Sequence, residues 1–365
     1  GVSEVVDALR TVLLRHAALR TRFVDDGGDV RQVVDDAGAV VLELYRVARG
    51  AVARTVQALF ERRQSIVFRR ASDWPLRAQL VVGPDGPAVL LVVLNHIAVD
   101  GAGALLLVAE LERLLAGQAP DDVAEVGSPL DIAAEEGTPS LRQRHARTVD
   151  RWRRTLADAP ATAFGHPPFP ADQPRFRALT MASEAVTLAV ARIVARQRVS
   201  GSAVLCTAWA QVLGQATGNT DIAQQIIVHN RFDVRRRRMV GVFAQPGLLR
   251  VDLAGRSFDE AVGAMLAAML EAYRSGYYEP EEIRRLLADL ARKRGTPVDL
   301  SVYFNDVRPA DDRSFAGRRV PAEATEQRLV ELSRQTTIVD SGGWPRIDAT
   351  CFVTTGRQDR ATTVQ

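Results

Sequence analysis

The residue best placed to do chemistry is His96, within residues 95–101 (Asn-His-Ile-Ala-Val-Asp-Gly). It follows an apolar run, and Asp100 comes four residues later. A neutral imidazole in this position can take a proton from an amine or alcohol as that group attacks an acyl carbon. Asp100 can fix the turn or hold the ring, and Gly101 lets backbone approach closely before a helix begins. A lone histidine beside a strand is often structural, so the pattern alone leaves both interpretations open.

Other kinds of catalytic site lack a matching pattern. The remaining histidines show no metal-ligand spacing, and no carboxylate or thiolate cluster accompanies them. They are His16, His145, His166 and His229. The sequence contains no Gly-x-Ser-x-Gly and no glycine-rich phosphate loop after a strand. It therefore predicts no metal site and favours neither a hydrolase nor a nucleotide-dependent enzyme.

The segments around His96 predict a strand–turn–helix junction. Residues 76–82 and 88–95 are β-rich apolar runs on either side of residues 83–87 (Gly-Pro-Asp-Gly-Pro), which predicts a hairpin. A helix over residues 102–115 is expected after the Asp100-Gly101 pair. Such a junction holds polar side chains on a rigid platform and leaves them reachable.

The rest of the chain alternates between expected helices and strands. Helices are expected at residues 2–20, 141–157, 183–197, 202–216, 258–275 and 280–294, an extended region at 30–45, and strands at 221–229, 298–305, 328–338 and 347–355. Residues 160–174 hold five of the 17 prolines and show no periodicity. We therefore expect two α/β lobes, residues 1–160 and 175–365, joined by a linker at 161–174 and meeting at a cleft.

The composition is that of an ordinary globular protein. The 47 basic and 44 acidic residues nearly cancel, so charge gives no case for a nucleic-acid or membrane partner. Lys293 is the sole lysine, which we interpret as the bias of a GC-rich genome. Two cysteines, Cys206 and Cys351, in apolar surroundings fit a reducing cytoplasm. The longest apolar run has the length of a strand, and because Gly1 lies inside a helical pattern, further residues are expected before it.

Several segments together resemble condensation domains of nonribosomal peptide synthetases and their acyltransferase relatives. Residues 95–101 resemble the signature His-His-x-x-x-Asp-Gly, and residues 15–23 are similar to Arg-His-x-x-Leu-Arg-Thr-x-Phe. Residues 240–243, followed by 249–252, are similar to Val-Gly-x-Phe-Val-Asn-Thr, with Asn230-Arg231 just upstream. Four landmarks in the right order are more specific than any one. The resemblance implies a chloramphenicol-acetyltransferase-like α/β fold, with two lobes of mixed sheets and flanking helices arranged as a V around a central tunnel.

The resemblance also implies a reaction. The protein would be an acyltransferase that moves an acyl group from a carrier-bound thioester to an amine or hydroxyl, forming an amide or ester in nonribosomal peptide, antibiotic or related natural-product biosynthesis. His96 would be the catalytic residue, either as a base or as an electrostatic stabiliser. No permanently bound cofactor is implied, because phosphopantetheine on a carrier protein, or coenzyme A, supplies the thioester. The expected partners are a peptidyl or acyl carrier protein and a small-molecule or carrier-bound acceptor, and we expect a cytoplasmic monomer.

Other residues receive supporting roles by the same resemblance. Asp100 is expected to pair with Arg20 and so tie the first helix to the catalytic turn, next to Gly101. Asn95 replaces the first histidine of the signature and is expected to keep its structural role through hydrogen bonds. A place in the substrate channel, with packing as the open alternative, is expected for Asn230, Arg231, Tyr277 and Asn305.

Departures from the family pattern leave other interpretations open. Residues 244–246 and 276–280 match the family only loosely, so substrate choice is undetermined. One rival is a coenzyme A-dependent acyltransferase that acts on small molecules. A second is an epimerisation domain, although its catalytic glutamate has no convincing counterpart. A third is a non-catalytic recruitment module. The run Arg235–Arg238 is either a docking patch for an acidic carrier or a solvated loop.

Overall fold

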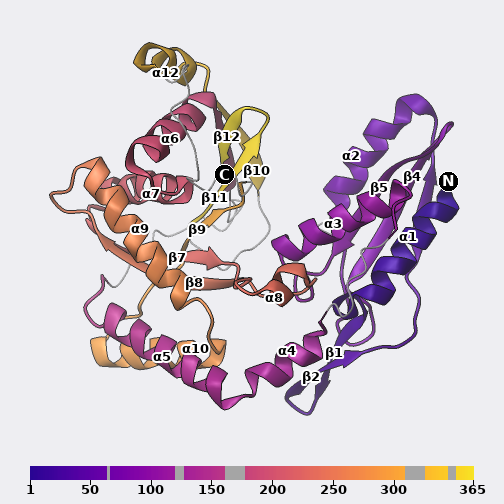
Figure 1. Cartoon of the computed structure of the whole chain (residues 1–365), viewed down its shortest axis with the longest axis horizontal. Helices are drawn as coiled ribbons and strands as arrows, with labels where there is room; N and C mark the ends of the chain where they lie inside the picture. Colours follow the sequence, from indigo (N-terminus) through magenta and orange to yellow (C-terminus); the bar gives the residue numbers. More distant parts are fainter. Residues whose placement is uncertain (64–65, 120–126, 161–176, 309–324, 344–350) are drawn as a thin grey trace. The chain divides into compact units, whose positions relative to one another are not determined.

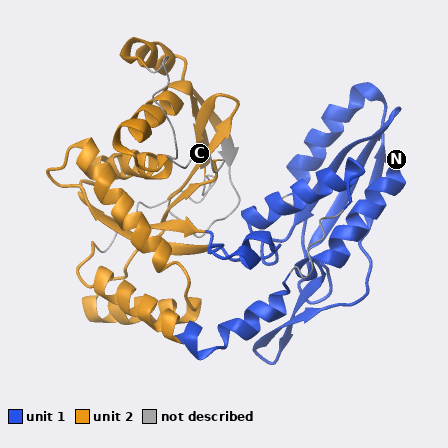
Figure 2. Cartoon of the chain, in the orientation of Figure 1, with its two compact units in different colours: residues 1–142, 229–244 blue, residues 143–228, 245–365 orange. Residues whose placement is uncertain are grey.

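The computed structural model describes the chain except residues 64–65, 120–126, 161–176, 309–324 and 344–350. Its packing defines two compact units (Figure 2). Unit 1 contains residues 1–142 and 229–244, and unit 2 contains residues 143–228 and 245–365. The predicted linker at 161–174 lies outside the described residues.

Unit 1 is built on a three-stranded sheet. Strand β3 (Leu42–Arg46) runs parallel to β4 (Leu76–Gly83), which pairs antiparallel with β5 (Gly86–Leu94). Gly83 pairs with Gly86, so the predicted hairpin is confirmed. Helices α1 (Val2–Arg15) and α3 (Gly101–Leu115) supply buried valines and leucines to a common core with β4. This core fixes the strand and the helix on either side of His96.

Smaller elements complete unit 1 (Figure 1). They are η1 (Ala17–Arg20), β1 (Thr21–Asp26), β2 (Asp29–Val34), η2 (Arg49–Ala51), α2 (Val52–Arg62), α4 (Pro129–Glu136) and α8 (Val234–Arg238). Strands β1 and β2 form a separate antiparallel pair. The first helix ends at Arg15 instead of continuing to Arg20, because His16 adopts an extended conformation and a short 3-10 helix follows.

Unit 2 is built on a seven-stranded mixed sheet in the order β10-β6-β12-β11-β9-β7-β8. The strands are β6 (Arg177–Ser183), β7 (Asp221–Val228), β8 (Gln245–Asp252), β9 (Val302–Asp306), β10 (Thr337–Gly343), β11 (Cys351–Gln358) and β12 (Ala361–Val364). The helices are α5 (Pro139–Leu156), which begins in unit 1, α6 (Glu184–Gln197), α7 (Gly201–Thr217), α9 (Phe258–Arg274), α10 (Pro280–Arg294) and α12 (Glu326–Ser333). Helices α6, α7 and α9 share one apolar core with the sheet, and α7 is buried along most of its length.

Two segments pack differently from the predicted lobes. Trp152 and Leu156 of α5 lie in an apolar cluster with Leu248 and Tyr278, which belong to unit 2. Residues 229–244, between strands β7 and β8 of unit 2, pack with unit 1. The division into lobes at residue 160 stays a prediction. In the structure α5 packs with residues of unit 2, and residues 229–244 pack with unit 1.

The strand predicted at residues 328–338 is wrong in its first half. Residues 326–333 form α12, and a strand begins only at Thr337. The hydroxyl oxygen of Thr325 accepts a hydrogen bond from the Arg328 backbone N–H at 3.2 Å, which caps the helix. The side chain of Leu332 is buried, whereas the other side chains of this short helix are mostly exposed.

Candidate active site

The His96 turn is held by backbone hydrogen bonds on both sides of the histidine. The Asn95 N–H donates to the Pro75 carbonyl at 2.9 Å, and the Asn95 carbonyl accepts from the Ala98 N–H at 3.0 Å. The Asn95 side-chain oxygen accepts from the Ile97 N–H at 3.2 Å, so Asn95 supports the turn as expected from its hydrogen-bonding capacity. His96 itself is exposed, and within the described part of the chain no side chain hydrogen-bonds its ring. An imidazole on a fixed turn is therefore open to a reactant.

Asp100 anchors the end of this turn. Its carboxylate caps α3 by accepting from the Gly103 N–H at 2.8 Å. The other carboxylate oxygen accepts from the backbone N–H groups of Phe243 (2.9 Å) and Ala244 (3.2 Å). Only 1% of Asp100 is exposed, so these donors replace the water that the carboxylate loses on burial.

The expected ion pair between Asp100 and Arg20 is wrong. Asp100 pairs instead with Arg231, whose guanidinium lies 2.7 Å from the carboxylate. Arg20 donates to the carbonyls of Leu13 (2.9 Å) and Leu14 (3.5 Å) in the last turn of α1. These carbonyls have no partner within the helix, and a guanidinium following the helix end satisfies them. Arg20 therefore caps α1, and the partner of Asp100 in the His96 turn is Arg231.

Arg231 organises the segment 229–244 around Asp100. It donates to the carbonyls of Arg236 and Met239, both at 2.6 Å, and stacks over the Phe243 ring at 4.7 Å. Asn230 is buried with a φ of 52° and donates to the Phe243 carbonyl at 2.9 Å. These contacts give both residues a structural part beside the site. Their predicted place in a channel stays a prediction.

The close backbone approach expected at Gly101 occurs two residues later. A Cβ at Gly101 would meet nothing within 4 Å, so this position tolerates a side chain. A Cβ at Gly103 would lie 3.1 Å from the Gly241 carbonyl oxygen and 3.2 Å from the Gly241 nitrogen. The Asp100 N–H donates to the same carbonyl at 3.0 Å. The first turn of α3 therefore packs directly on backbone of the 239–243 loop, a contact that only glycine at position 103 permits without a shift.

The two remaining predicted channel residues lie in unit 2. Tyr277 is buried and meets the His145 ring edge-on, with the ring centres 5.5 Å apart. Asn305 is half-buried on β9, between the buried residues Phe304 and Asp306. Neither position tests a substrate role. For Tyr277 the contacts describe packing.

His16 has the environment of a structural histidine. It is buried, and its Nε2 lies 2.6 Å from the Glu110 carboxylate of α3. Arg15 lies 3.2 Å from the other oxygen of the same carboxylate. Burial acts to raise the pKa of Glu110, but the hydrogen bond and charge of His16, with Arg15 and Arg113, outweigh it, so the pKa is lowered. This cluster ties α1 to α3 and leaves no ring face for chemistry.

A family model described as Condensation domain matches residues 2–331. The chain belongs to the condensation-domain family. The four sequence landmarks therefore reflect membership of this family. In this condensation domain the Asp100–Arg231 pair holds the signature turn.

Relatives of this condensation domain occur in large synthetases. The protein described as "Probable non-canonical nonribosomal peptide synthetase (NRPS) CymA" of Salinispora arenicola is 29% identical over 301 residues, covering 74% of this chain and 4% of that protein. The "Isonitrile lipopeptide synthase" of Mycobacterium tuberculosis is 31% identical over 289 residues, covering 73% of this chain and 11% of that protein. The domain thus spans a small part of the length of these relatives.

Solved structures share the fold. The X-domain from teicoplanin biosynthesis has a TM-score of 0.70 and 21% identity, covering 100% of this chain and 81% of that chain. The predicted α/β fold class is confirmed.

Among the described helices, none combines the length and hydrophobicity that a membrane span requires. The described residues also contain no group of three or more His, Cys, Asp or Glu arranged to hold a metal ion.

Some parts of the site had no sequence signal. The link from Asp100 to Arg231 joins residues 131 positions apart, and the Gly103–Gly241 contact leaves no periodic pattern. The sequence drew attention to Asn230-Arg231, which matches a family landmark, but it did not indicate that Arg231 is the partner of Asp100.

Proposed function

We propose that this condensation domain transfers an acyl group from a thioester to an amine or hydroxyl acceptor, with His96 at the reaction centre. The observation that carries the proposal is an exposed imidazole on a turn fixed by Asn95 and Asp100. The acceptor attacks the thioester carbonyl, a C–N or C–O bond forms, and the C–S bond breaks. His96 takes the acceptor proton, or stabilises the tetrahedral intermediate, and the proton leaves on the departing thiol.

We further propose that the donor thioester is carried on phosphopantetheine of a carrier protein, in the cytoplasm. The relatives named as synthetases support this, and so does the basic segment α8, where Arg235, Arg237 and Arg238 are exposed. Arg236 forms ion pairs with Glu135 at 3.0 Å and Asp233 at 2.8 Å, so it is not available to a carrier, and Arg235 lies 3.6 Å from the Asp131 carboxylate. The rival donor is free coenzyme A.

The test compares His96→Ala and His96→Gln with the unaltered chain. We expect His96→Ala to lower turnover by roughly 10²–10⁴-fold, because a positioned base contributes about that much. Gln can hydrogen-bond but cannot accept a proton at neutral pH, so near-normal turnover in His96→Gln would identify a positioning role. Thermal melting should not change, because His96 is exposed. Normal product formation by His96→Ala would rule out the assigned role.

The donor assay separates the rivals. The protein is given an acyl-carrier thioester or the matching acyl-coenzyme A, with a panel of amines and alcohols, and products are identified by mass spectrometry. A strong preference for coenzyme A esters favours a small-molecule acyltransferase. A recruitment module is the second candidate, supported by a structure of the teicoplanin X-domain in complex with OxyB. Absence of product with every donor, together with tight binding of a partner protein, would favour the recruitment module.

A further inference from the structure

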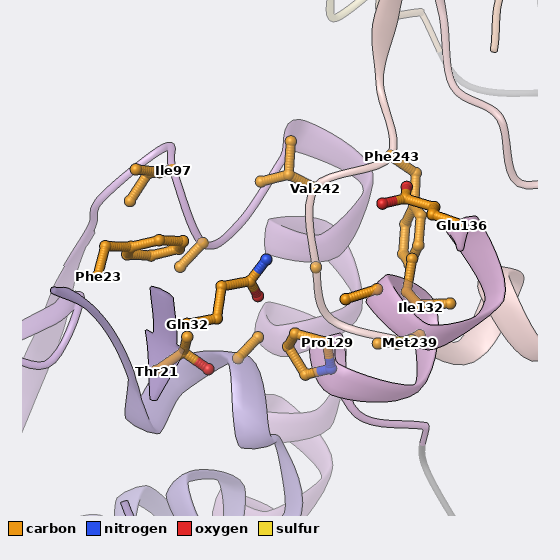
Figure 3. Close-up of a pocket in the computed structure, with 14 residues that line it drawn as sticks. Thr21, Phe23, Gln32, Ile97, Pro129, Ile132, Glu136, Met239, Val242 and Phe243 are labelled. Carbon is orange, nitrogen blue, oxygen red and sulfur yellow. The ribbon is translucent and has the colours of Figure 1, made fainter. Parts of the chain in front are cut away.

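A hollow of about 240 Å³ lies beside the His96 turn in unit 1 (Figure 3). Ile97 and Ala98 of the turn line it, together with Met239 and Phe243 of the neighbouring loop. Because this turn and this loop form the candidate active site, the hollow belongs to that site. A separate feature, in unit 2, is the charge carried by one helix.

Helix α5 (Pro139–Leu156) concentrates positive charge. It contains six arginines and one aspartate, which give it a net charge of +5. The whole chain has a net charge of +3, so the residues outside α5 are together slightly negative. The charge of α5 is therefore a local property of this helix and does not follow from the composition of the chain.

Four of the arginines form a row along one side of α5. They are three, four and three residues apart, and residues at these spacings are neighbours on a helix surface. This arginine row consists of Arg144, Arg147, Arg151 and Arg154. With a rise of 1.5 Å per residue, it is about 15 Å long. The buried side chains of α5 lie on another side and are His145, Thr148, Trp152 and Leu156. The packing of α5 therefore leaves the row at the surface, where three of its arginines are exposed and Arg151 is half-buried.

One carboxylate is divided between the arginine row and a neighbouring arginine. Glu271 of α9 forms ion pairs with Arg151 and with Arg274, the latter at 2.7 Å. The charge of Arg151 is the main reason that the pKa of Glu271 lies below its ordinary value. Glu271 is therefore ionised and already shared by two guanidinium groups.

The exposed arginines of the row have no carboxylate partner in the described part of the chain. Arg144 lies over the Tyr277 ring, 5.6 Å from its centre, and neither Arg147 nor Arg154 forms an ion pair there. The one aspartate of α5 pairs with Arg153 instead. Like charges three or four residues apart destabilise a helix. The row therefore costs stability, and no internal carboxylate offsets that cost.

Helix α10, which shares an apolar cluster with α5, carries its arginines differently (Figure 1). Arg284 and Arg285 both pair with Glu281, one turn earlier in the same helix. Arg292 pairs with Asp289. The exposed arginines of α10 are therefore compensated within the helix, whereas those of the arginine row are not.

We propose that the arginine row is a docking surface for an acidic helix of another protein. A guanidinium binds a carboxylate through two parallel hydrogen bonds, so arginine suits the recognition of glutamate and aspartate. A partner helix with carboxylates at the same spacing would meet the row along its length and relieve the repulsion between its arginines. This docking does not require acyl transfer, so either proposal can fail without the other.

A protein fits this surface better than a nucleic acid does. Asp150 and Glu271 lie beside the row, and the residues outside α5 are net negative. A long polyphosphate would extend past the row and meet this negative charge, whereas a helix with a few carboxylates would end with the row.

The binding test uses two fluorescein-labelled, alanine-rich helical peptides and the intact chain. In the matched peptide four glutamates follow the spacing of the arginine row, and in the scattered peptide the same four are distributed around the helix. Fluorescence anisotropy should show tighter binding of the matched peptide. Because salt screens exposed ion pairs, its Kd should rise steeply between about 0.05 and 0.3 M salt. Equal affinity of the two peptides would overturn the proposal.

Two triple variants locate the surface. The row variant replaces the three exposed arginines by glutamine: Arg144→Gln, Arg147→Gln and Arg154→Gln. The control variant removes the same charge from the neighbouring helix: Arg284→Gln, Arg285→Gln and Arg292→Gln. The Kd of the matched peptide should rise about tenfold in the row variant, because three exposed ion pairs together contribute about that factor. It should stay within about twofold in the control variant. Equal effects would show that only net charge matters and would contradict the proposal.

Melting temperature and a nucleic-acid probe complete the test. The row variant should melt no lower than the unaltered chain, because it removes repulsion between like charges. A lower melting temperature would assign these arginines to the fold and not to a partner. Tighter binding of a single-stranded oligonucleotide than of the matched peptide, lost in the row variant, would make the row a nucleic-acid surface and overturn the proposal.

Discussion

Two buried aspartate–arginine pairs, one in each unit, use the same chemistry for different ends. In unit 1, Asp100 and Arg231 are 131 positions apart in sequence. In unit 2, Asp306 and Arg308 are two positions apart, with a side-chain contact of 2.7 Å. All four side chains are at most 8% exposed, so each pair has given up nearly all its water.

The other hydrogen-bond donors to each carboxylate explain the difference. Asp306 accepts from the hydroxyls of Ser202 (2.6 Å) and Thr355 (2.8 Å), which joins β9 to α7 and β11. Asp100 accepts from backbone N–H groups in α3 and in the loop after Arg231. The unit 2 pair therefore holds side chains within a core, whereas the unit 1 pair fixes backbone on both sides of the candidate site. We therefore expect changes to the unit 1 pair to affect the candidate site more than changes to the unit 2 pair.

Arg231→Ala should have the largest effect. Removing one partner of a buried pair leaves an uncompensated charge, at a cost of about 3–5 kcal/mol in the free energy of unfolding. Loss of the Arg231 donors also frees the carbonyls of Arg236 and Met239, so acyl transfer should fall even where the variant remains folded. Urea denaturation measures the loss of stability, and transfer kinetics measure the loss of acyl transfer. Arg49→Ala, which breaks an exposed pair with Asp85, is the matched control and should change neither.

Arg308→Ala should cost somewhat less, about 3 kcal/mol, because two hydroxyls continue to donate to Asp306. At a temperature where both Arg231→Ala and Arg308→Ala are folded, Arg308→Ala should keep normal transfer kinetics. If it loses as much activity as Arg231→Ala, the distinction between a core pair and a site pair fails.

A smaller effect should appear in the pH dependence of stability. Burial acts to raise the pKa of Asp306, but hydrogen bonds and the charge of Arg308 outweigh it, so the folded-state pKa lies below the ordinary value. The stabilisation is therefore complete above the unfolded pKa of about 4 and is lost as the pH falls through the lower folded value. Asp306→Asn should flatten the fall of the urea midpoint that accompanies acidification below about pH 4. An unchanged slope would show that other carboxylates dominate acid unfolding.

The sequence predicted those parts of the molecule that depend on local patterns. The strand, turn and helix around His96 follow from two β-rich apolar runs, the glycine-proline turn between them and the Asp100-Gly101 pair before the helix, and all three are present. The partner of Asp100 depends on folding of distant segments, and no spacing rule encodes it. The prediction that Arg20 pairs with Asp100 is wrong because Arg20 donates instead to the free carbonyls at the end of α1, which lie close to it in sequence. Residues 326–333 were missed because a capped helix with one buried leucine resembles an exposed strand in composition.

The route of the chain through unit 1 has a consequence for biosynthesis. Residues 229–244 leave strand β7 and return at β8, two neighbouring strands of the other sheet. A ribosome that has synthesised the chain as far as residue 142 has therefore made Asp100 without its arginine. Because segments emerge in order at about 5–20 residues per second, the newborn protein spends several seconds with that carboxylate unneutralised. The histidine turn can therefore reach its final form only after Arg231, 131 residues further along the chain, has been made and has packed against Asp100.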